Sequence, residues 1–448
     1  MRRTIRPLLA AASVLVAGLP VGLGALAPSP IAPAAAAAGV DLTCSLALTK
    51  TDPDTINLAY PDEAADYYSV VFPNLPGIRL RITGQFPHAR YISFNVYDPQ
   101  LRPIDAIADV EMAPDRGSRN PFEAGARRGA KARTYTAYVD FGAAPDRRRD
   151  RAPNTIYSGE MADGTPLPGS GLIYRIYTPD RGRDDFGDVP IPTVTLERTG
   201  STDPVTPSMC EQLTKPTITF LTELTQAGEV LPEPVDSALP FGYETPRWRR
   251  FENLPAAVAD NALENPTLEQ VRPLLDPLTP YFGQGGFLSN IHNSYVYAAT
   301  NRAYGKVLVT RFRTPTFPDT RDGARRMDAA QVRYWSICQT EFYSQRYIAC
   351  RQDDQVVSRR GWATVVVSTP GQRPSRATRR CGVTWMPWGP VPEGALLLRH
   401  MLPADDFEQT VAVAEYRKER RTMKGYLPRS TYYADAEDFD ANAALRCR

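Results

Sequence analysis

The sequence has few of the residues on which most catalytic sites are built. Its 448 residues include three histidines, His88, His292 and His400. It contains no His-Glu-x-x-His, no Gly-x-Ser-x-Gly, no Cys-x-x-Cys and no glycine-rich phosphate loop. These absences argue against a zinc peptidase, an α/β-hydrolase, a thioredoxin-type redox protein and a nucleotide-dependent enzyme. His400 lies in an apolar strand-like run, so we expect it to be packed rather than catalytic.

The chain also lacks an excess of charge of either sign. Lys and Arg number 52 and Asp and Glu 50; the first 38 residues hold three arginines and no acid, so residues 39–448 have 49 bases and 50 acids. No basic run alternates with aromatic residues, and we expect the short run Arg147–Arg151 to be a solvated loop. The sequence therefore does not predict binding to nucleic acid.

The N-terminus has the pattern of a secretory signal peptide. A basic start, MRRTIR, precedes an apolar stretch at 8–26 and a run of small residues that ends near Ala38. Pro20 and several glycines interrupt the stretch, which makes it a poor membrane anchor. We expect residues 1–38 to be removed by Sec or twin-arginine export, which leaves a secreted or envelope protein without a membrane-spanning segment.

The rest of the chain repeats itself. RYIS (90–93) recurs as RYWS (333–336), and GLIYRIYTPD (171–180) recurs as GALLLRHMLPAD (394–405). The second alignment places Arg175 on Arg399. Just before RYWS, the second copy has an insert at 316–330. Several such matches follow one another in the same order, so we interpret them as an internal duplication.

Both copies contain runs of alternating apolar and polar residues, rich in aromatic and β-branched side chains and bounded by turn residues. Examples are YYSVVF, IRLRITGQF, YISFNVY, TYTAYVDF, LIYRIY, VLVTRF, RYWSIC and ATVVVS. This pattern is typical of antiparallel sheets packed as a sandwich, or of the related jelly roll. The sequence therefore predicts a mainly β protein with two tandem β-sandwich modules, residues 61–205 and 286–448.

The segments outside these modules have a different character. Residues 39–60 form an N-terminal arm, and residues 206–285 are expected to be a mostly helical connector. Within the connector, Pro begins and Gly follows a helical pattern at 216–228, and Asn caps another at 265–275. DDFEQTVAVAEYRKERR (405–421) opens with a capping pattern and predicts a C-terminal helix.

Six cysteines in an exported chain predict three disulfides. Cys338 and Cys350 lie on neighbouring strand-like segments and face each other if these segments form a hairpin. The other four would then pair so that each disulfide stays near one module, Cys44 with Cys210 and Cys381 with Cys447.

The repeated arginine lies beside a tyrosine that we expect in the core, and a buried arginine needs a partner. Asp109 follows Arg90 by 19 residues, and Asp354 follows Arg333 by 21. We expect an Arg90–Asp109 pair and an Arg333–Asp354 pair, each tying strands of its own module. In the alternative, both arginines face an open groove and form two anion-binding sites.

Two clusters are candidates for ligand binding. Trp385 and Trp388, if exposed, would form a stacking platform for a sugar ring; the repeat aligns Trp385 with Tyr157, which favours its burial. Oxygen-rich loops bind Ca²⁺ in extracellular modules, although a solvated turn fits the spacing in PDRGRDDFGD better. The acids of that loop are Asp180, Asp184, Asp185 and Asp188.

The run PGIRLRITGQFPHARYISFNVYD, together with RYWSICQ, CGVTWMPWG and LLLRHMLPADDF, resembles a family of exported, uncharacterised actinobacterial proteins. The resemblance covers nearly the whole mature chain and implies no activity or functional residue. We expect an exported protein that binds a carbohydrate or other ligand at the cell envelope. The alternative is a glycan or cell-wall hydrolase, because its carboxylate pair would have no fixed spacing in sequence.

Overall fold

The structure, a computed structural model, describes residues 44–211, 242–262 and 288–447, except positions 55, 162, 201, 202, 204, 207, 416 and 446. The expected signal peptide and the connector helices at 216–228 and 265–275 lie outside these residues. Within the described ranges, no helix has both the length and the apolar character needed to cross a membrane.

The first half of the chain forms two five-stranded sheets. The outer sheet has the order β1-β10-β4-β7-β8, and the inner sheet has the order β2-β3-β9-β5-β6. The outer strands are β1 (Ser45–Leu46), β10 (Thr193–Arg198), β4 (Ile78–Gln85), β7 (Thr134–Asp140) and β8 (Thr155–Tyr157). The inner strands are β2 (Thr49–Lys50), β3 (Ala65–Pro73), β9 (Gly169–Pro179), β5 (Ala89–Tyr97) and β6 (Pro103–Ala108).

The second half has an inner sheet of order β11-β12-β19-β14-β15 and an outer sheet of order β16-β17-β13-β20, with β18 paired to β17. The inner strands are β11 (Arg249–Arg250), β12 (Asn293–Asn301), β19 (Glu393–Pro403), β14 (Val332–Thr340) and β15 (Tyr347–Gln352). The outer strands are β16 (Ser358–Arg359), β17 (Trp362–Ser368), β13 (Val307–Arg313), β20 (Arg429–Tyr433) and β18 (Thr384–Pro387).

The two halves have corresponding strand orders. In the inner sheets, β12-β19-β14-β15 matches β3-β9-β5-β6, and in the outer sheets β13 and β17 match β4 and β7. Each outer sheet also gains one parallel strand, β8 on β7 and β18 on β17. The mainly β fold is as the sequence predicts; a duplication as the origin of this correspondence stays a prediction.

The alternating pattern of the strands explains how each half packs. In β4, Ile78, Leu80 and Ile82 are buried in a core that also receives residues of the inner sheet, while Arg81 on the other face is exposed. Two sheets that share one apolar core in this way form a sandwich.

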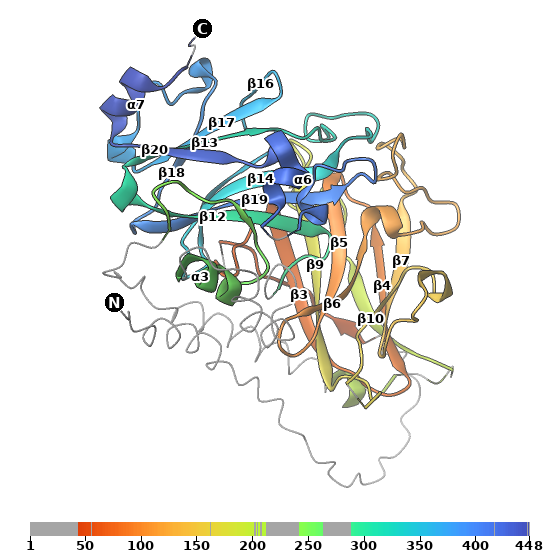
Figure 1. Cartoon of the computed structure of the whole chain (residues 1–448). Coiled ribbons are helices and arrows are strands. Elements are labelled where there is room, and N and C mark those ends of the chain that lie inside the picture. Colours follow the sequence, from red (N-terminus) through yellow and green to blue (C-terminus); the bar gives the residue numbers. More distant parts are fainter. Residues whose placement is uncertain are drawn as a thin grey trace, which may run out of the picture.

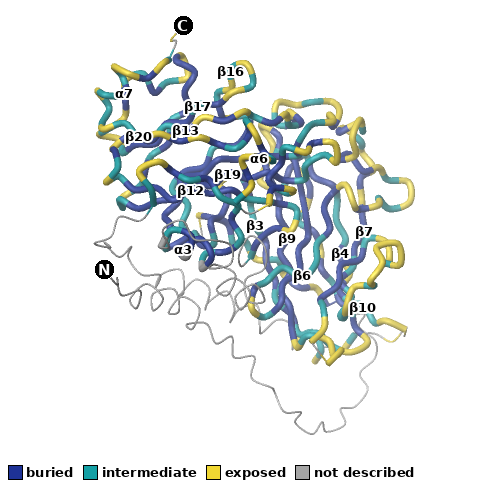
Figure 2. The backbone as a smooth tube through the Cα atoms, in the orientation of Figure 1, coloured by how far each residue is buried: buried dark blue, intermediate teal, exposed yellow. Residues whose placement is uncertain are grey.

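The two inner sheets lie in the middle of the molecule. Figure 1 shows the strands of the first half (red to yellow-green) running up the page and those of the second half (green to blue) running across it. Every residue of β5 and nearly every residue of β14 is buried, as the dark blue central strands of Figure 2 show. Tyr177 lies edge-on to both Tyr91 and Tyr334, with ring centroids 5.5 and 5.2 Å apart, so the halves meet through aromatic packing.

The repeated arginine forms two buried ion pairs that join the halves. Arg90 at the start of β5 is fully buried, and its Nη1 lies 2.5 Å from a carboxylate oxygen of Asp353, just after β15. Arg333 in β14 has its Nη1 3.0 Å from Asp109. The expected pairs Arg90–Asp109 and Arg333–Asp354 are therefore wrong, because each arginine pairs with an aspartate of the other half.

Each aspartate bonds to both halves through its two oxygens. Oδ2 of Asp109 accepts the backbone N–H of Ile92, and Oδ2 of Asp353 accepts that of Trp335, so each carboxylate is fixed to a strand of its own half. Oδ1 of each aspartate is left for the guanidinium of the opposite half. Burial nevertheless raises the pKa of Asp353 to about 6 against the lowering effect of Arg90, which shows that this charge is costly to bury.

The described helices are short: α3 (Leu254–Ala262), α6 (Glu419–Met423) and α7 (Ala436–Asn442), with 3-10 turns η1–η7 between strands. The predicted helix at 405–421 is wrong, because this segment contains only the turn η6 (Val411–Val413) and the start of α6. Arg250 donates hydrogen bonds to the carbonyls of Ala412 and Ala414. In a continuous helix these carbonyls would accept backbone N–H groups instead. The 3-10 turns are η1 (Asp109–Glu111), η2 (Arg148–Asp150), η3 (Arg302–Tyr304), η4 (Pro370–Gln372), η5 (Arg379–Cys381), η6 and η7 (Lys424–Tyr426).

The three disulfides pair as the sequence predicts. Cys338 and Cys350 lie directly opposite each other in the β14–β15 hairpin. Cys44 pairs with Cys210 across the first half, and Cys381 in η5 pairs with Cys447 at the end of the second.

We expect Asp353→Ala to lower the free energy of unfolding at pH 7 by about 3–5 kcal/mol, because it leaves Arg90 buried without its partner. The neighbouring Asp354 pairs with Arg321 at 3.4 Å in a partly exposed position, so Asp354→Ala should cost under about 1 kcal/mol. The double change Arg90→Met with Asp353→Leu should recover much of the loss. Denaturant unfolding of the four proteins measures these differences, and equal costs for the two alanine variants would contradict the pairing.

His400 predicts a pH dependence of stability. It lies in β19, is 1% exposed, and its pKa is lowered by burial to about 3. The unfolded chain binds a proton on this side chain below about pH 6.5, whereas the folded chain does not, so stability is lost as the pH falls from there toward 3. The contribution approaches about 1.4 kcal/mol per pH unit. The free energy of unfolding should therefore decrease less steeply from pH 7 to pH 4 in His400→Met than in the unaltered chain.

Candidate functional site

A cavity of about 90 Å³ lies between the two inner sheets. Its walls come from strands of both halves and from the N-terminal arm, which crosses from the first half to the second. The wall residues that matter for its chemistry are Tyr67, Tyr97, Ile173 and Arg175 of the first half, Tyr295, Leu397 and Arg399 of the second, and Leu58 and Tyr60 of the arm. In the part of the chain that the structure describes, no Asp or Glu lines the cavity.

Arg175 gives this cavity a positive charge. It lies in the middle of β9, is 2% exposed, and has Tyr67 and Tyr97 on its guanidinium with ring centroids at 5.5 Å. Its Nη2 donates to the carbonyl of Leu288 at 2.7 Å, but its Nη1 is buried without a hydrogen-bond acceptor. Among the described residues no carboxylate forms an ion pair with Arg175, and arginine cannot release its proton, so its charge is not balanced.

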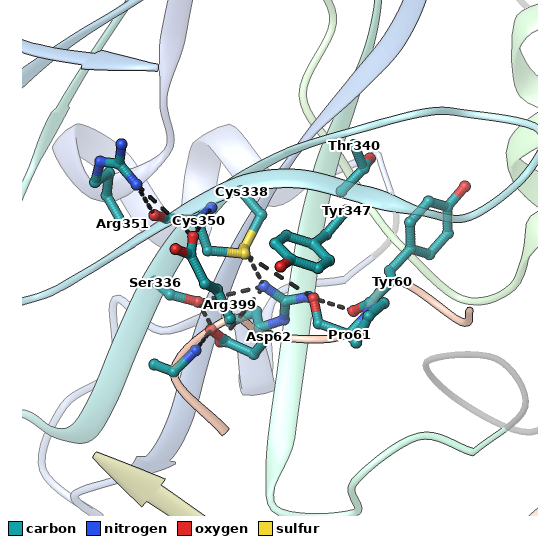
Figure 3. Close-up of a disulfide and its surroundings, with 12 residues drawn as sticks. Tyr60, Pro61, Asp62, Ser336, Cys338, Thr340, Tyr347, Cys350, Arg351 and Arg399 are labelled. Atoms are coloured by element: carbon teal, nitrogen blue, oxygen red, sulfur yellow. Dashed lines mark hydrogen bonds and ion pairs between the residues drawn. A yellow bond between two sulfur atoms is a disulfide. The ribbon is translucent and has the colours of Figure 1, made fainter. Parts of the chain in front are cut away.

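Arg399 lies at the equivalent position of β19 and has a full set of partners. It is 1% exposed, and its Nη1 lies 3.5 Å from the carboxylate of Asp62 and 3.3 Å from Oγ of Ser336. Nη1 also lies 2.6 Å from Sγ of Cys338, and Nη2 donates to the carbonyl of Tyr60, as Figure 3 shows. The positive charge of Arg399 is therefore balanced by the carboxylate of Asp62.

One difference in the repeat explains why the two arginines differ. Oδ1 of Asp62 accepts the N–H of Ala64, and Oδ1 of Asn290 accepts the N–H of His292, so the two residues hold the same turn in each half. Across the interface, Tyr334 donates to Asp62, while Asn290 bonds to the hydroxyl of Tyr91. An amide at 290 in place of a carboxylate removes the charge that Arg175 would have paired with.

The tyrosines around the cavity remain neutral donors. Burial raises the pKa of Tyr97 to about 12, and burial together with Asp62 raises the pKa of Tyr67. The hydroxyl of Tyr97 donates to the carbonyl of Ser289 at 2.8 Å, and that of Tyr67 accepts the N–H of Asp62 at 3.0 Å. The cavity therefore combines one unbalanced cation with apolar walls and hydroxyl groups, an arrangement suited to a small anion.

The predicted aromatic platform is wrong for Trp388. Its ring is 1% exposed in the core of the second half, and its Nε1 donates to the carbonyl of Pro392. Trp385 in β18 is half-buried beneath Arg373, whose guanidinium lies 4.5 Å from the ring centroid. Tyr157, at the matching place in β8, is buried and lies beneath Arg151 in the same way. No open stacking surface remains on these three rings.

The four acids of the loop after β9 do not converge on one point. Asp180 is buried and pairs with Arg128 at 2.6 Å, and Asp188 pairs with Arg183. Asp184 caps its own loop through the N–H of Phe186 and that of Asp188, and Asp185 lies 3.4 Å from Lys50. The structure does not bring these carboxylates together as ligands for Ca²⁺.

Asp62, Cys338 and Cys350 do place three potential metal ligands together. Both sulfurs belong to the β14–β15 disulfide, so neither is a thiolate that could bind a metal ion. The group is structural, and Figure 3 shows it packed around Arg399.

Sequence analysis did not identify Arg175 and Arg399 as site residues, although the repeat aligned them. The available signal was an arginine in the middle of an otherwise apolar strand, LIYRIY and LLLRHM. In a strand buried on both faces such a residue must have a partner or a role.

The fold and cavity define a mainly β protein of two corresponding halves with a charged hollow between them. No protein-family model matches this chain, and no curated protein matches it in a sequence search. An uncharacterised protein from Burkholderia cenocepacia is similar in structure, at 11% identity over 87% of this chain and 82% of that chain, with a TM-score of 0.46. A protein from Vibrio parahaemolyticus has 12% identity over 86% of this chain and 92% of that chain, with a TM-score of 0.38. These similarities assign no activity.

The two arginines should differ in their effect on stability. Arg399→Met leaves Asp62 buried without its cation and should lower the free energy of unfolding by about 3–5 kcal/mol. Arg175→Met removes a buried charge that has no acid partner and should be neutral or stabilising. Denaturant unfolding of the purified variants compares them, and a larger loss for Arg175→Met would contradict the assignment of the unbalanced charge.

Proposed function

We propose that this chain is an exported binding protein that holds a short-chain carboxylate in the cavity between its halves. The carboxylate lies against Arg175, and the aliphatic part of the ligand packs on Ile173, Leu397 and Leu58. The expected signal peptide and the three disulfides support a role outside the cytoplasm.

The observation that carries this proposal is the buried, unpaired guanidinium of Arg175. Leaving a charge buried without a counter-ion is expensive, and natural sequences retain such groups where a ligand completes them. Arg399 occupies the equivalent strand position and also donates Nη2 to a backbone carbonyl, but there Asp62 supplies a negative charge. A bound carboxylate would balance the charge of Arg175 as Asp62 balances that of Arg399.

The cavity volume limits the size of the ligand. An apolar cavity of about 150 Å³ is known to hold benzene. The cavity here, at about 90 Å³, therefore suits a smaller molecule such as acetate, propionate or butyrate. A carboxylate and a guanidinium also match in geometry, because two parallel N–H···O bonds can form between them.

The alternative of a glycan hydrolase finds no support at this site. Such an enzyme needs two carboxyl groups about 5–10 Å apart. Among the described residues, no Asp or Glu lines the cavity, and its volume is too small for a sugar ring with its neighbours. Binding is therefore the function that the geometry favours.

The test measures thermal unfolding of the purified exported protein with acetate, propionate and butyrate, and with the corresponding neutral amides. A ligand that occupies the site should stabilise the protein in a saturable way, by about 2.7 kcal/mol when its concentration is 100 times Kd. The amides should have no such effect, because they lack the charge that pairs with Arg175.

The variant Arg175→Met should abolish the stabilisation. Arg81→Met makes the same change at an exposed position of β4 and should leave it intact. If the carboxylates stabilise both variants equally, or if chloride alone reproduces their effect, the cavity is not a carboxylate site.

A further inference from the structure

A second hollow, separate from the cavity, lies on the surface where loops of the two halves meet. It is a groove of about 860 Å³ lined in the first half by His88, Gly117, Arg119, residues 127–132, Asp180 and Arg183, and in the second half by residues 323–326. We call it the basic groove, because six of its side chains are exposed cations. They are Arg119, Arg127, Lys131, Arg183, Arg325 and Arg326.

The groove is formed by the insert at 316–330, which has no counterpart in the first half. Met327 of the insert is 1% exposed in the apolar core of the first half. Its backbone bonds to Gly125 and Ala126, and the N–H of Arg128 bonds to the carbonyl of Arg325. The insert is therefore fixed on the first half. Its Arg325 and Arg326 lie beside the loop that contains Arg119, Arg127 and Lys131.

These contacts bring like charges together. Arg127 and Arg326 face each other as partners in an isolated antiparallel bridge. Like charges directly opposite each other across strands are destabilising. Neither residue has an ion pair among the described parts of the chain; Arg326 donates one hydrogen bond, to the carbonyl of Gly125.

Little negative charge offsets this concentration of arginine. Asp180 is the one acid among the groove's lining residues, and it pairs with the buried Arg128 at 2.6 Å. Arg183 pairs with Asp188 outside the lining, so five of the six exposed cations have no ion pair among the described residues. Beneath them, Arg133 is also buried and contacts His88. Burial and the nearby Arg128 lower the pKa of Arg133 to about 10, and burial and Arg133 lower the pKa of His88, as expected in a positive field.

We propose that the basic groove binds a linear anionic polysaccharide, with its negative groups lying along the exposed arginines contributed by both halves. A single small anion would engage one or two of the six cations, whereas a chain with a negative group on each sugar engages them in succession. Arginine suits this task because its guanidinium pairs with carboxylate, sulfate or phosphate oxygens through two hydrogen bonds.

The groove favours a polysaccharide over a nucleic acid. No Phe, Tyr or Trp is among its lining residues, so single-stranded bases have no ring on which to stack. None of the described residues that line it belongs to a named helix or strand, the elements that enter the major groove of a duplex. The expected export of the protein also places the groove among the polymers of the cell envelope.

The experiment measures binding of the purified exported protein at about 0.1 M salt to four fluorescent polymers: polygalacturonate, heparin, polyphosphate and a single-stranded oligonucleotide. The groove variant carries Arg127→Gln and Arg326→Gln. It should bind the polysaccharides about tenfold more weakly or worse, and it should melt at the same or a higher temperature because the like-charge contact is gone. The matched control carries Arg147→Gln and Arg149→Gln, the same charge change in an exposed loop of the first half, and should bind normally.

The comparison between polymers identifies the chemistry of the anion. Preference for polygalacturonate points to carboxylated chains, and preference for heparin points to sulfated ones; either supports the proposal. Equal loss in the groove variant and the control would overturn it, because binding would then follow net charge alone. Tighter binding of the oligonucleotide or of polyphosphate than of both polysaccharides would also overturn it.

Discussion

The structure depends on two buried ion pairs in which an arginine of each half binds an aspartate of the other half. Arg90 reaches Asp353 and Arg333 reaches Asp109, and each aspartate is held at the same time by a backbone N–H of its own half. A buried ion pair adds little to stability relative to a well-packed apolar pair, but it strongly disfavours arrangements in which either charge is unpaired. The four residues therefore specify how the inner sheets meet, and the aromatic contacts of Tyr177 fill the space that this register leaves.

The sequence predicted the features that depend on neighbouring residues. Strands were recognisable from their period-two pattern, and Cys338 and Cys350 from the adjacent segments that form one hairpin. The partner of Arg90 was not recognisable, because it depends on which face of a sheet meets the other half. The helix expected at 405–421 was also wrong because of a contact that is distant in sequence. Arg250 donates to the carbonyl of Ala414, which would accept a backbone N–H in a continuous helix. Arg175 was visible as an arginine in an apolar strand, but its lack of a partner required the structure.

The cavity and the basic groove both arise where the two halves stop being equivalent. A carboxylate at Asp62 pairs with one buried arginine, whereas the amide at Asn290 leaves the other without an acid partner among the described residues. The insert at 316–330 exists in one half and brings its arginines to the other. In a protein with two similar halves, such differences identify positions where packing alone does not explain the residue, and both proposals concern these positions.

The disulfides also determine which part of the backbone would carry a mechanical load. Cys44–Cys210 links residues 166 apart in sequence and encloses nearly all of the first half. Cys381–Cys447 encloses the last part of the second half. A pull on the two ends of the folded chain would pass from sulfur to sulfur and bypass both enclosed segments. Because Cys338–Cys350 closes a third loop, the stretching force would act on the backbone between residues 210 and 338 and between residues 350 and 381, and not on the strands of the first half. A protein tethered at one end and dragged at the other would thus keep that half folded under tension.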